Sequence, residues 1–397
     1  MKAPLSLEEA QTKLLALSPA FSTECVPTET SLGRVVSETV IALRTQPSAD
    51  LSAMDGYALS AGQGPWSLVG ESRAGAPFTG ALRNDQCVRI STGAIVPDGA
   101  ISVLLQEDAV RVDDSVSARQ APAPGRHIRP CGFDFRSGDV LFTRGARMTA
   151  GRIALALTAG HSQIPVTHKP RVTVIDSGDE LTLDPATCLP HQVPASNSAM
   201  IAAMLAPLGC DVTRIGPVPD NQSALGAAFA QSADADVVII SGGASVGDHD
   251  LVQPSLLAAG AQVAFWKVAI KPGKPLLVAS RQGGRGRQVV LGLPGNPVSS
   301  FVTAFLFALP LIKAIQGDPA PFPKTEVAFT GEDLPATGSR REFLRGVREG
   351  NTVRLAGSQD SSALSALAQA NCLINRAAFA PALQSGEPVM VFNLQNG

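Results

Sequence analysis

A short apolar run followed by a loop of small residues lies in the second half of the chain. Residues 237–240 are Val-Val-Ile-Ile, four consecutive β-branched side chains, which is typical of a strand buried on both faces of a parallel sheet. Residues 241–247 (Ser-Gly-Gly-Ala-Ser-Val-Gly) form a loop whose backbone N–H groups can approach an anion. Ligands of an open α/β sheet bind outside the carboxyl ends of its strands. We therefore predict a binding site here. The alternative is that these small residues only form the turn between the strand and the next helix.

The loop matches neither common nucleotide-binding fingerprint. No Lys-Ser/Thr pair follows it, as a P-loop requires, and the chain contains no G-x-G-x-x-G motif. Asp248 and Asp250 close the loop, and Lys267, Lys271 and Lys274 follow in or near later tight turns. Carboxylates, lysines and the amino end of the apolar helix that comes next are suited to a phosphate ester bound with a divalent metal.

Composition limits the classes of protein to which the chain can belong. At 397 residues it is too long for one ordinary core, and 45% hydrophobic with 17% charged residues is typical of a globular protein. The formal net charge of -2 argues against a nucleic-acid binder that works by bulk charge. The six cysteines form no C-x-x-C pair, which favours reduced thiols over a zinc site. We see no apolar run of about 18 residues and no signal peptide, so we expect a cytoplasmic protein without a membrane partner.

Changes of pattern along the chain predict a multidomain α/β protein. The patterns at residues 7–17 and 148–161 are helical, and we expect these two helices to pack beside each other, which would make the β-rich sequence between them an insertion. A later region alternates strand and helix in the βαβ manner, which predicts a central open α/β sheet domain. The predicted domains are a discontinuous N-terminal domain (1–47 and 137–170), a β-rich insertion domain (48–136), the α/β domain (171–318) and a C-terminal β domain (319–397).

Acidic residues gather where strands of the predicted sheet end. Asp179, Glu180, Asp220 and Asp250 all lie at predicted carboxyl ends of strands, which is where such a sheet carries its function. Four arginines cluster near residue 345 of the C-terminal domain. A charge cluster of this kind is usually a solvated face, and an oxyanion site is the sharper alternative.

Six short motifs occur in a fixed order along nearly the whole chain. They are Ser52-Ala-Met-Asp-Gly-Tyr-Ala58, Arg89-Ile-Ser-Thr-Gly-Ala94 with Pro97, Ser177-Gly-Asp-Glu180, Ser241-Gly-Gly-Ala-Ser-Val-Gly247 with Asp250, Lys271-Pro-Gly-Lys-Pro275 and Leu293-Pro-Gly-Asn-Pro-Val-Ser299. The series closely resembles the molybdopterin molybdenumtransferases, which include the bacterial MoeA proteins and the C-terminal domain of gephyrin. One departure is Asp176-Ser177, which stands where that family commonly has Ser-Thr before Gly-Asp-Glu.

The resemblance implies a homodimer, with the N-terminal domain as linker and dimerisation domain, that inserts molybdate into adenylylated molybdopterin. Mg²⁺ would be the cofactor, and AMP and molybdenum cofactor the products. The implied metal and nucleotide-facing carboxylates are Asp179, Glu180, Asp220 and Asp250. The implied molybdate-binding residues are Lys271, Lys274, Ser299, Arg345 and Ser361, in which lysines supply point charge, arginine a planar fork and serines neutral donors. The implied catalytic residues are Glu180, Asp220, Asp250, Lys267 and Lys271, with Asp55, Thr92 and Asp134 reaching the site of the partner subunit.

Two other functions remain open from the sequence. An adenylyltransferase acting on molybdopterin would share the fold of the α/β domain, but such proteins are short and this chain has three further domains. A scaffold that binds proteins through its β domains would not need the carboxylate and lysine set. A molybdopterin adenylyltransferase is also a candidate partner, because it would supply the adenylylated substrate.

Overall fold

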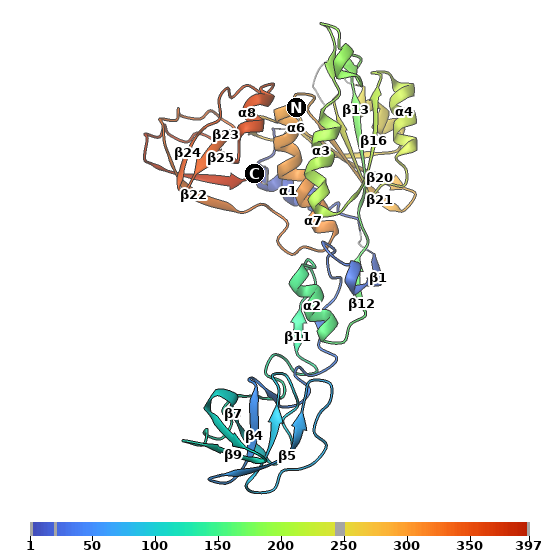
Figure 1. Cartoon of the computed structure of the whole chain (residues 1–397). Coiled ribbons are helices and arrows are strands. Elements are labelled where there is room, and N and C mark those ends of the chain that lie inside the picture. The colour runs from blue at the N-terminus through green and yellow to red at the C-terminus, as the bar shows by residue number, and fades with distance from the viewer. Residues whose placement is uncertain (1–2, 20–21, 243–250, 395–397) are drawn as a thin grey trace.

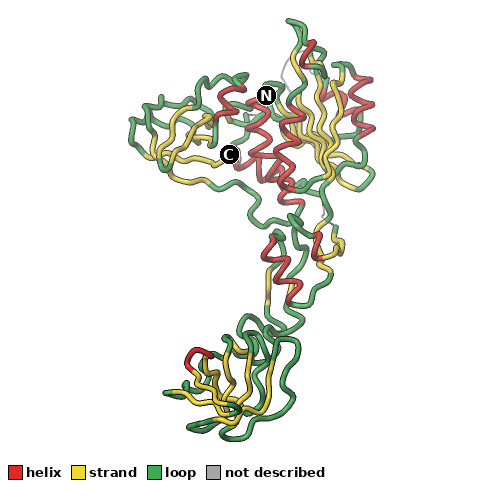
Figure 2. Tube along the Cα trace, in the orientation of Figure 1, coloured by secondary structure: helices red, strands yellow, loops and turns green. Residues whose placement is uncertain are grey.

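The computed structural model describes residues 3–19, 22–242 and 251–394 of the chain. It is elongated, with a wide part that holds both termini, a slender neck, and a β domain at the far end of the neck (Figure 1). Figure 2 shows that helices concentrate in the wide part and that the far domain consists almost entirely of strands and loops. The fold is therefore multidomain α/β, as predicted.

A six-stranded sheet organises the wide part. Its order is β16-β13-β17-β21-β20-β18, in which β16, β13, β17 and β21 are parallel and the last two pairings are antiparallel. A hairpin at residues 283–286 joins β20 to β21. The strands are β13 (Arg171–Ser177), β16 (Asp211–Val218), β17 (Val237–Ser241), β18 (Gln262–Trp266), β20 (Leu277–Gly283) and β21 (Gly286–Leu293).

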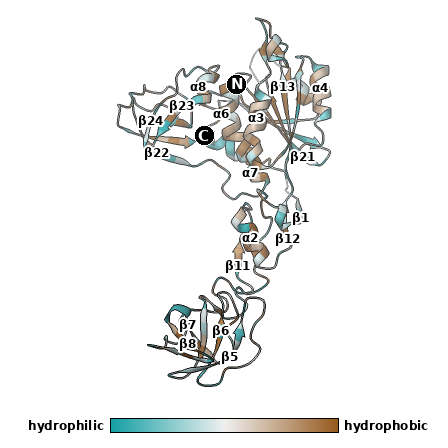
Figure 3. Ribbon diagram, viewed as in Figure 1, coloured by the Kyte–Doolittle hydropathy of each residue, from teal (hydrophilic) through white to brown (hydrophobic). Residues whose placement is uncertain are grey.

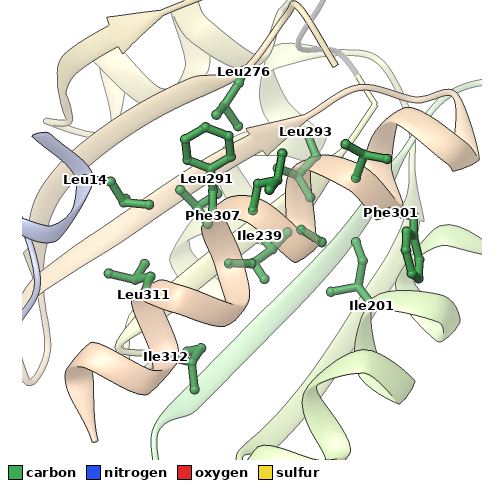
Figure 4. Packing of buried hydrophobic residues seen from close by; sticks show 14 of the residues in the cluster. Leu14, Ile201, Ile239, Leu276, Leu291, Leu293, Phe301, Phe307, Leu311 and Ile312 are labelled. Carbon is green, nitrogen blue, oxygen red and sulfur yellow. The ribbon is translucent and has the colours of Figure 1, made fainter. Parts of the chain in front are cut away.

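Helices cover both faces of this sheet, because alternate strand residues point to opposite sides. Ile239 and Leu291 contribute to a cluster with α3, α6 and α7 on one face, whereas Ile240 and Val290 pack with α4 and α5 on the other. Figure 4 shows the first cluster, and Figure 3 shows how hydrophobic β13 and α7 are. The helices are α3 (Asn197–Leu205), α4 (Gln222–Gln231), α5 (Val252–Ala258), α6 (Pro297–Thr303) and α7 (Leu309–Ile315).

A π-helical turn, Ala304–Ala308, joins α6 to α7 and makes one continuous apolar helix. Within the described residues, this helix (Pro297–Ile315) is the one long and apolar enough to cross a membrane, but 78% of its apolar window is buried in the fold. It serves as the central helix of the core.

The N-terminal helix does not pack where we expected. Leu14 of α1 (Leu7–Leu15) points into the cluster around α7, beside Leu291 and Phe307 (Figure 4), and Gln11 Nε2 donates a 2.9 Å hydrogen bond to the Leu306 carbonyl. The helix α2 (Ala150–Thr158) lies instead in the neck. The predicted pairing of these two helices is therefore wrong, because an amphipathic stripe shows that a helix has a partner without identifying it.

Strands, rather than helices, bring the two neck segments together. β1 (Thr23–Pro27) pairs antiparallel with β12 (Gln163–Thr167), and β2 (Val40–Ile41) pairs with β11 (Val140–Phe142). The far β domain is inserted between them. Its sheet has the order β7-β4-β6-β5-β9-β8 and is joined to the neck through the β3–β10 pair. These strands are β3 (Leu51–Ser52), β4 (Gly56–Ser60), β5 (Trp66–Ser72), β6 (Gln86–Ile90), β7 (Ala100–Leu105), β8 (Ala109–Val112), β9 (Ser115–Ala118) and β10 (Ile128–Arg129).

The C-terminal strands form a second six-stranded sheet in the wide part. Its order is β19-β23-β24-β22-β26-β25, and a β23–β25 pairing closes it into a small barrel. Phe343 and Phe392 of the barrel pack with Phe305 of the central helix, so the two parts share a core. The elements are β19 (Ile270–Lys271), β22 (Thr325–Thr330), β23 (Arg341–Glu349), β24 (Thr352–Leu355), α8 (Leu364–Gln369), β25 (Cys372–Arg376) and β26 (Pro388–Asn393).

Candidate functional site

A pocket of about 600 Å³ lies at the carboxyl ends of β13, β17 and β21. The strand order changes direction between β13 and β17, and ligands of open α/β sheets bind at such switch points. One wall comes from the excursion that contains the short pair β14 (Leu181–Thr182) and β15 (Val193–Pro194). The pocket's polar lining residues are Asp176, Ser177, Glu180, Ser196, Asn197, Asp220, Ser241, Asn296 and Ser362.

The strand ends approach each other so closely that one position tolerates no side chain. Gly242 follows β17 with a φ of +100°, and a Cβ atom there would lie 2.0 Å from the backbone oxygen of Ser177. A glycine at this turn therefore lets the chain leave the sheet beside β13. The small-residue loop predicted from the sequence begins here, but residues 243–250, including Asp250, lie outside the described part of the chain.

Two of the predicted carboxylates line the pocket, and a third supports one of them. Glu180 and Asp220 are lining residues. Asp179 accepts a 3.0 Å hydrogen bond from the backbone N–H of Asp220, and Ser177 Oγ donates to Asp220 Oδ1 at 2.7 Å. The turn after β13 therefore fixes the position of Asp220 from both its backbone and its side chain.

These carboxylates suit a Mg²⁺ ion that is bound together with a substrate. No group of three or more His, Cys, Asp or Glu side chains is arranged as a complete metal site among the described residues. Mg²⁺ usually binds proteins through one or two carboxylates, completed by waters and substrate phosphates. Glu180 and Asp220 form no ion pair with any residue that the structure describes. The residues present therefore fit a partial site of this kind.

Asn197 was not identified as a site residue from the sequence. It is the first residue of α3, and it ties that helix to the ends of two strands, β17 and β21. Its Nδ2 atom donates to Ser241 Oγ at 2.8 Å and to the Gly295 carbonyl at 2.7 Å. A carbonyl can only accept, so the Asn197 NH₂ group faces Gly295 and its own oxygen is left for other partners. The sequence offered one signal for this role: Asn197 begins the helix that follows the acidic turn of β13 and the β14–β15 pair.

Asp176 is the second residue that sequence reasoning did not place in the site. It is only 3% exposed, and its carboxylate accepts from the Ser198 N–H at 3.1 and 3.3 Å, which holds the first turn of α3 against β13. Burial raises the pKa of the Asp176 carboxyl above its usual range, while the Ser198 hydrogen bonds and the Arg214 charge oppose that rise. Asp176 therefore positions Asn197 indirectly.

The C-terminal barrel closes one side of the pocket. Asn296 Nδ2 donates to Ser361 Oγ at 3.0 Å, the Val298 N–H donates to the Ser361 carbonyl at 3.2 Å, and the next residue, Ser362, lines the pocket. Arg345 is buried and its Nη2 holds this loop through the Asp360 carbonyl at 3.0 Å. Two of the predicted molybdate residues therefore occur together: Ser361 at the pocket edge, and Arg345 behind it.

The three predicted lysines and Ser299 lie outside the lining of the described pocket. Lys271 Nζ lies 3.2 Å from Glu342 Oε1 in an ion pair, and Lys274 is exposed in the turn that follows. Lys267 has an unusual positive φ of +88°, with its Nζ 5.3 Å from the centre of the Trp266 ring. The predicted residue Ser299 lies one turn into α6 and is buried, at 5% exposed. None of these residues is among those that line the described pocket.

The remaining predicted residues lie far from the pocket of the same chain. Asp55 Oδ1 accepts hydrogen bonds from the Thr92 N–H at 2.7 Å and from Thr92 Oγ1 at 3.1 Å, which lower the pKa of the Asp55 carboxyl. Both residues belong to the far β domain, at the opposite end of the neck (Figure 1). The backbone N–H of Asp134 bonds to the Gln46 carbonyl at 3.0 Å, at the base of the neck. One chain therefore brings Asp55 and Thr92 together, but not with Glu180 and Asp220.

Comparison with known families covers almost the whole chain. Residues 5–160 match the family described as MoeA N-terminal region (domain I and II). Residues 173–314 match a probable molybdopterin binding domain, and residues 328–394 match the MoeA C-terminal region (domain IV).

Individual relatives are similar over the same extent. The molybdopterin molybdenumtransferase of Haemophilus influenzae is 34% identical over 383 residues, which are 93% of this chain and 94% of that protein. The enzyme of the same name from Nostoc sp. is 33% identical, with 94% and 89% covered. The crystal structure of the molybdopterin biosynthesis MoeA protein from Pyrococcus horikosii superposes with a TM-score of 0.85 and 27% identity, covering 98% of this chain and 99% of that one.

Proposed function

The chain belongs to the molybdopterin molybdenumtransferases, and from that premise we propose that it inserts molybdate into adenylylated molybdopterin with Mg²⁺, releasing AMP. One observation carries this proposal above the others. The pocket at the strand switch point joins Glu180 and Asp220 on one side to Asn296 and Ser362 on the other. Carboxylates suited to a metal and a phosphate thus lie beside the barrel loop that carries Ser361, one of the proposed oxyanion residues.

The carboxylates are proposed to hold the nucleotide end of the substrate. Glu180 and Asp220 would bind Mg²⁺ together with the pyrophosphate. Asp179 would keep Asp220 in place by accepting the hydrogen bond from the Asp220 backbone N–H. When bound, the ion would neutralise negative charge that develops on the departing AMP. Asn197 would orient the substrate with its free side-chain oxygen, because both of its described donor contacts go to the protein. Asp250, outside the described residues, stays a proposed member of this set.

The barrel side is proposed to hold molybdate. Lys274, Ser299 and Ser361 would supply a point charge and two hydroxyl donors. Lys271 would add a second charge and Lys267 would support them, with Arg345 fixing the Ser361 loop. Molybdate held next to the two thiol sulfurs would form two Mo–S bonds while one oxo ligand leaves as water with the two thiol protons. A water oxygen would attack the phosphoanhydride, so that this bond breaks and AMP leaves. Placing both reactants in one pocket lowers the entropic part of the barrier.

A homodimer is part of the proposal, because one chain does not bring Asp55, Thr92 and Asp134 to its own pocket. The neck has exposed apolar side chains at Ile41 and Val140, which are partners in the β2–β11 register, and at Leu157 of α2. Exposed apolar groups gathered on one small domain favour burial against a second copy. We place the reaction in the cytoplasm, with the molybdopterin adenylyltransferase as a candidate partner and no membrane or nucleic-acid partner.

The test is release of AMP from adenylylated molybdopterin, measured with and without molybdate and with and without Mg²⁺. We expect release that depends on both. An adenylyltransferase would instead form the adenylylated compound from ATP, and a scaffold would release nothing. Release of AMP that is indifferent to molybdate would contradict the proposed function.

A further inference from the structure

Three charged residues form one row across the edge of the C-terminal barrel. Lys271 of β19 lies opposite Glu342 of β23 in the parallel pairing, and Glu342 lies opposite Arg376 of β25 in the antiparallel pairing. Residues directly opposite each other on neighbouring strands have Cβ atoms about 4.5–5.5 Å apart. Glu342 is therefore flanked by a cation on each side.

Among the described residues, Glu342 forms an ion pair with Lys271 and none with Arg376. The Lys271–Glu342 contact is 3.2 Å, with the lysine side chain 52% exposed and the glutamate 14% exposed. Because side chains alternate along a strand, Glu342 shares its face of β23 with Leu344, whereas Arg345 shares the opposite face with Phe343. The ion pair therefore directs Lys271 to the face opposite Arg345, away from the other proposed molybdate residues.

Arg376 offers Glu342 a second partner. It is only 3% exposed, its Nη2 donates to the Pro381 carbonyl, and its Nη1 has no hydrogen-bond partner among the described residues. A buried guanidinium nitrogen without a partner is destabilising, so a carboxylate that turned toward it would be favoured. The carboxylate can thus leave Lys271 without losing a cationic neighbour.

From this row we infer that Glu342 is a positioning residue for the oxyanion. In the free enzyme, the Glu342 carboxylate holds the Lys271 ammonium group. When molybdate binds, the carboxylate leaves Lys271 and turns to Arg376. The inference rests on the proposed function, since it assigns Lys271 to the oxyanion. Glu342 would then compete with molybdate for the same ammonium group. Its carboxylate would therefore lower the affinity for molybdate, a dianion, and for other oxyanions with one or two negative charges.

The test is a titration of molybdate into wild-type and Glu342→Gln protein, by calorimetry with molybdate alone and by AMP release at fixed adenylylated substrate. Partly exposed ion pairs are worth roughly 0.2–1 kcal/mol, so their loss should lower the molybdate midpoint by about 1.4- to 5-fold. Turnover at saturating molybdate and the affinity for the adenylylated substrate should stay unchanged. A midpoint that is unchanged or higher in folded Glu342→Gln protein overturns the inference.

Matched variants separate this effect from a general loss of surface charge. Glu326→Gln removes the partner of Arg348 in the same barrel and should leave the molybdate midpoint as it is. In a Lys271→Ala background, Glu342→Gln should have no further effect, since the two residues act through one contact. Glu342→Asp, which shortens the reach to Lys271 and keeps the charge beside Arg376, should shift the midpoint in the same direction by less. An equal shift in Glu326→Gln, or a full shift without Lys271, also overturns the inference, whereas a wild type that binds no molybdate overturns the proposed function itself.

Discussion

Ser177 Oγ donates a 2.7 Å hydrogen bond to Oδ1 of Asp220, across the gap between the ends of β13 and β16. Both residues line the pocket, so this bond fixes one oxygen of a carboxylate at the site. Ser177 therefore decides which way the Asp220 carboxylate is presented.

We expect Asp220→Asn to lower turnover by roughly 10²–10³-fold, as for removal of one preorganised charge-stabilising group. Ser177→Ala keeps the carboxylate but frees its rotation, and should raise the Mg²⁺ midpoint by about 10-fold, as for loss of a residue that supports a metal ligand. AMP release titrated with Mg²⁺ measures both. An unchanged Mg²⁺ midpoint in folded Ser177→Ala protein would show that Asp220 is not held for a metal.

Asn197 should matter for both stability and turnover. Asn197→Ala removes the hydrogen bonds to Ser241 Oγ and the Gly295 carbonyl. Leaving these two oxygens without that donor should lower the free energy of unfolding by about 1–3 kcal/mol. Ser6→Ala, which removes the capping box of α1, should cost about 1 kcal/mol without slowing AMP release. Urea unfolding and AMP release, measured on both variants, compare the effects. Equal turnover in the two variants would place Asn197 outside the reaction.

Asp176 predicts a pH effect on stability. Its folded-state pKa is raised above the ordinary 3.8, so the folded protein keeps this proton to a higher pH than the unfolded chain does. The stabilising effect of that proton is present at low pH and is lost as the pH rises from 3.8 through the raised folded-state pKa. Asp176→Asn has no such loss. Its stability relative to wild type should therefore increase over this window and then level off, as measured by urea unfolding from pH 3.5 to 8; parallel curves would contradict the assigned burial effect.

Sequence patterns predicted the features that depend on residues close together along the chain. The run at 237–240 predicted the buried strand β17. Glu180 and Asp220 were expected at carboxyl ends of strands, and both line the pocket there. Contacts between segments far apart in the sequence could not be predicted from these patterns. Asn197 acts through Gly295, 98 residues away, and Lys271 pairs with Glu342, 71 residues away, and neither contact leaves a periodic trace in the sequence. The docking of α1 on the central helix was missed for the same reason.

The far β domain carries the last prediction. Asp55 is fixed by two hydrogen bonds from Thr92, yet the neck separates both from the pocket of their own chain. If a second copy supplies them, Asp55→Ala and Asp220→Ala affect different halves of each shared site. Each variant alone should be inactive. In a mixed dimer, one of the two sites would combine both variants and the other would combine neither.

Mixed dimers should therefore recover about half the activity of a wild-type dimer, since one complete site is restored. The dimers can be made by co-expression with two different affinity tags and sequential purification, followed by measurement of AMP release. Homodimers of each variant, carried through the same purification, are the control for contaminating wild-type enzyme. A subunit that served its own pocket would always lack either Asp55 or Asp220 in this mixture, so verified mixed dimers without activity would return Asp55 to its own subunit's site. An Asp55→Ala homodimer that is active would remove Asp55 from the site.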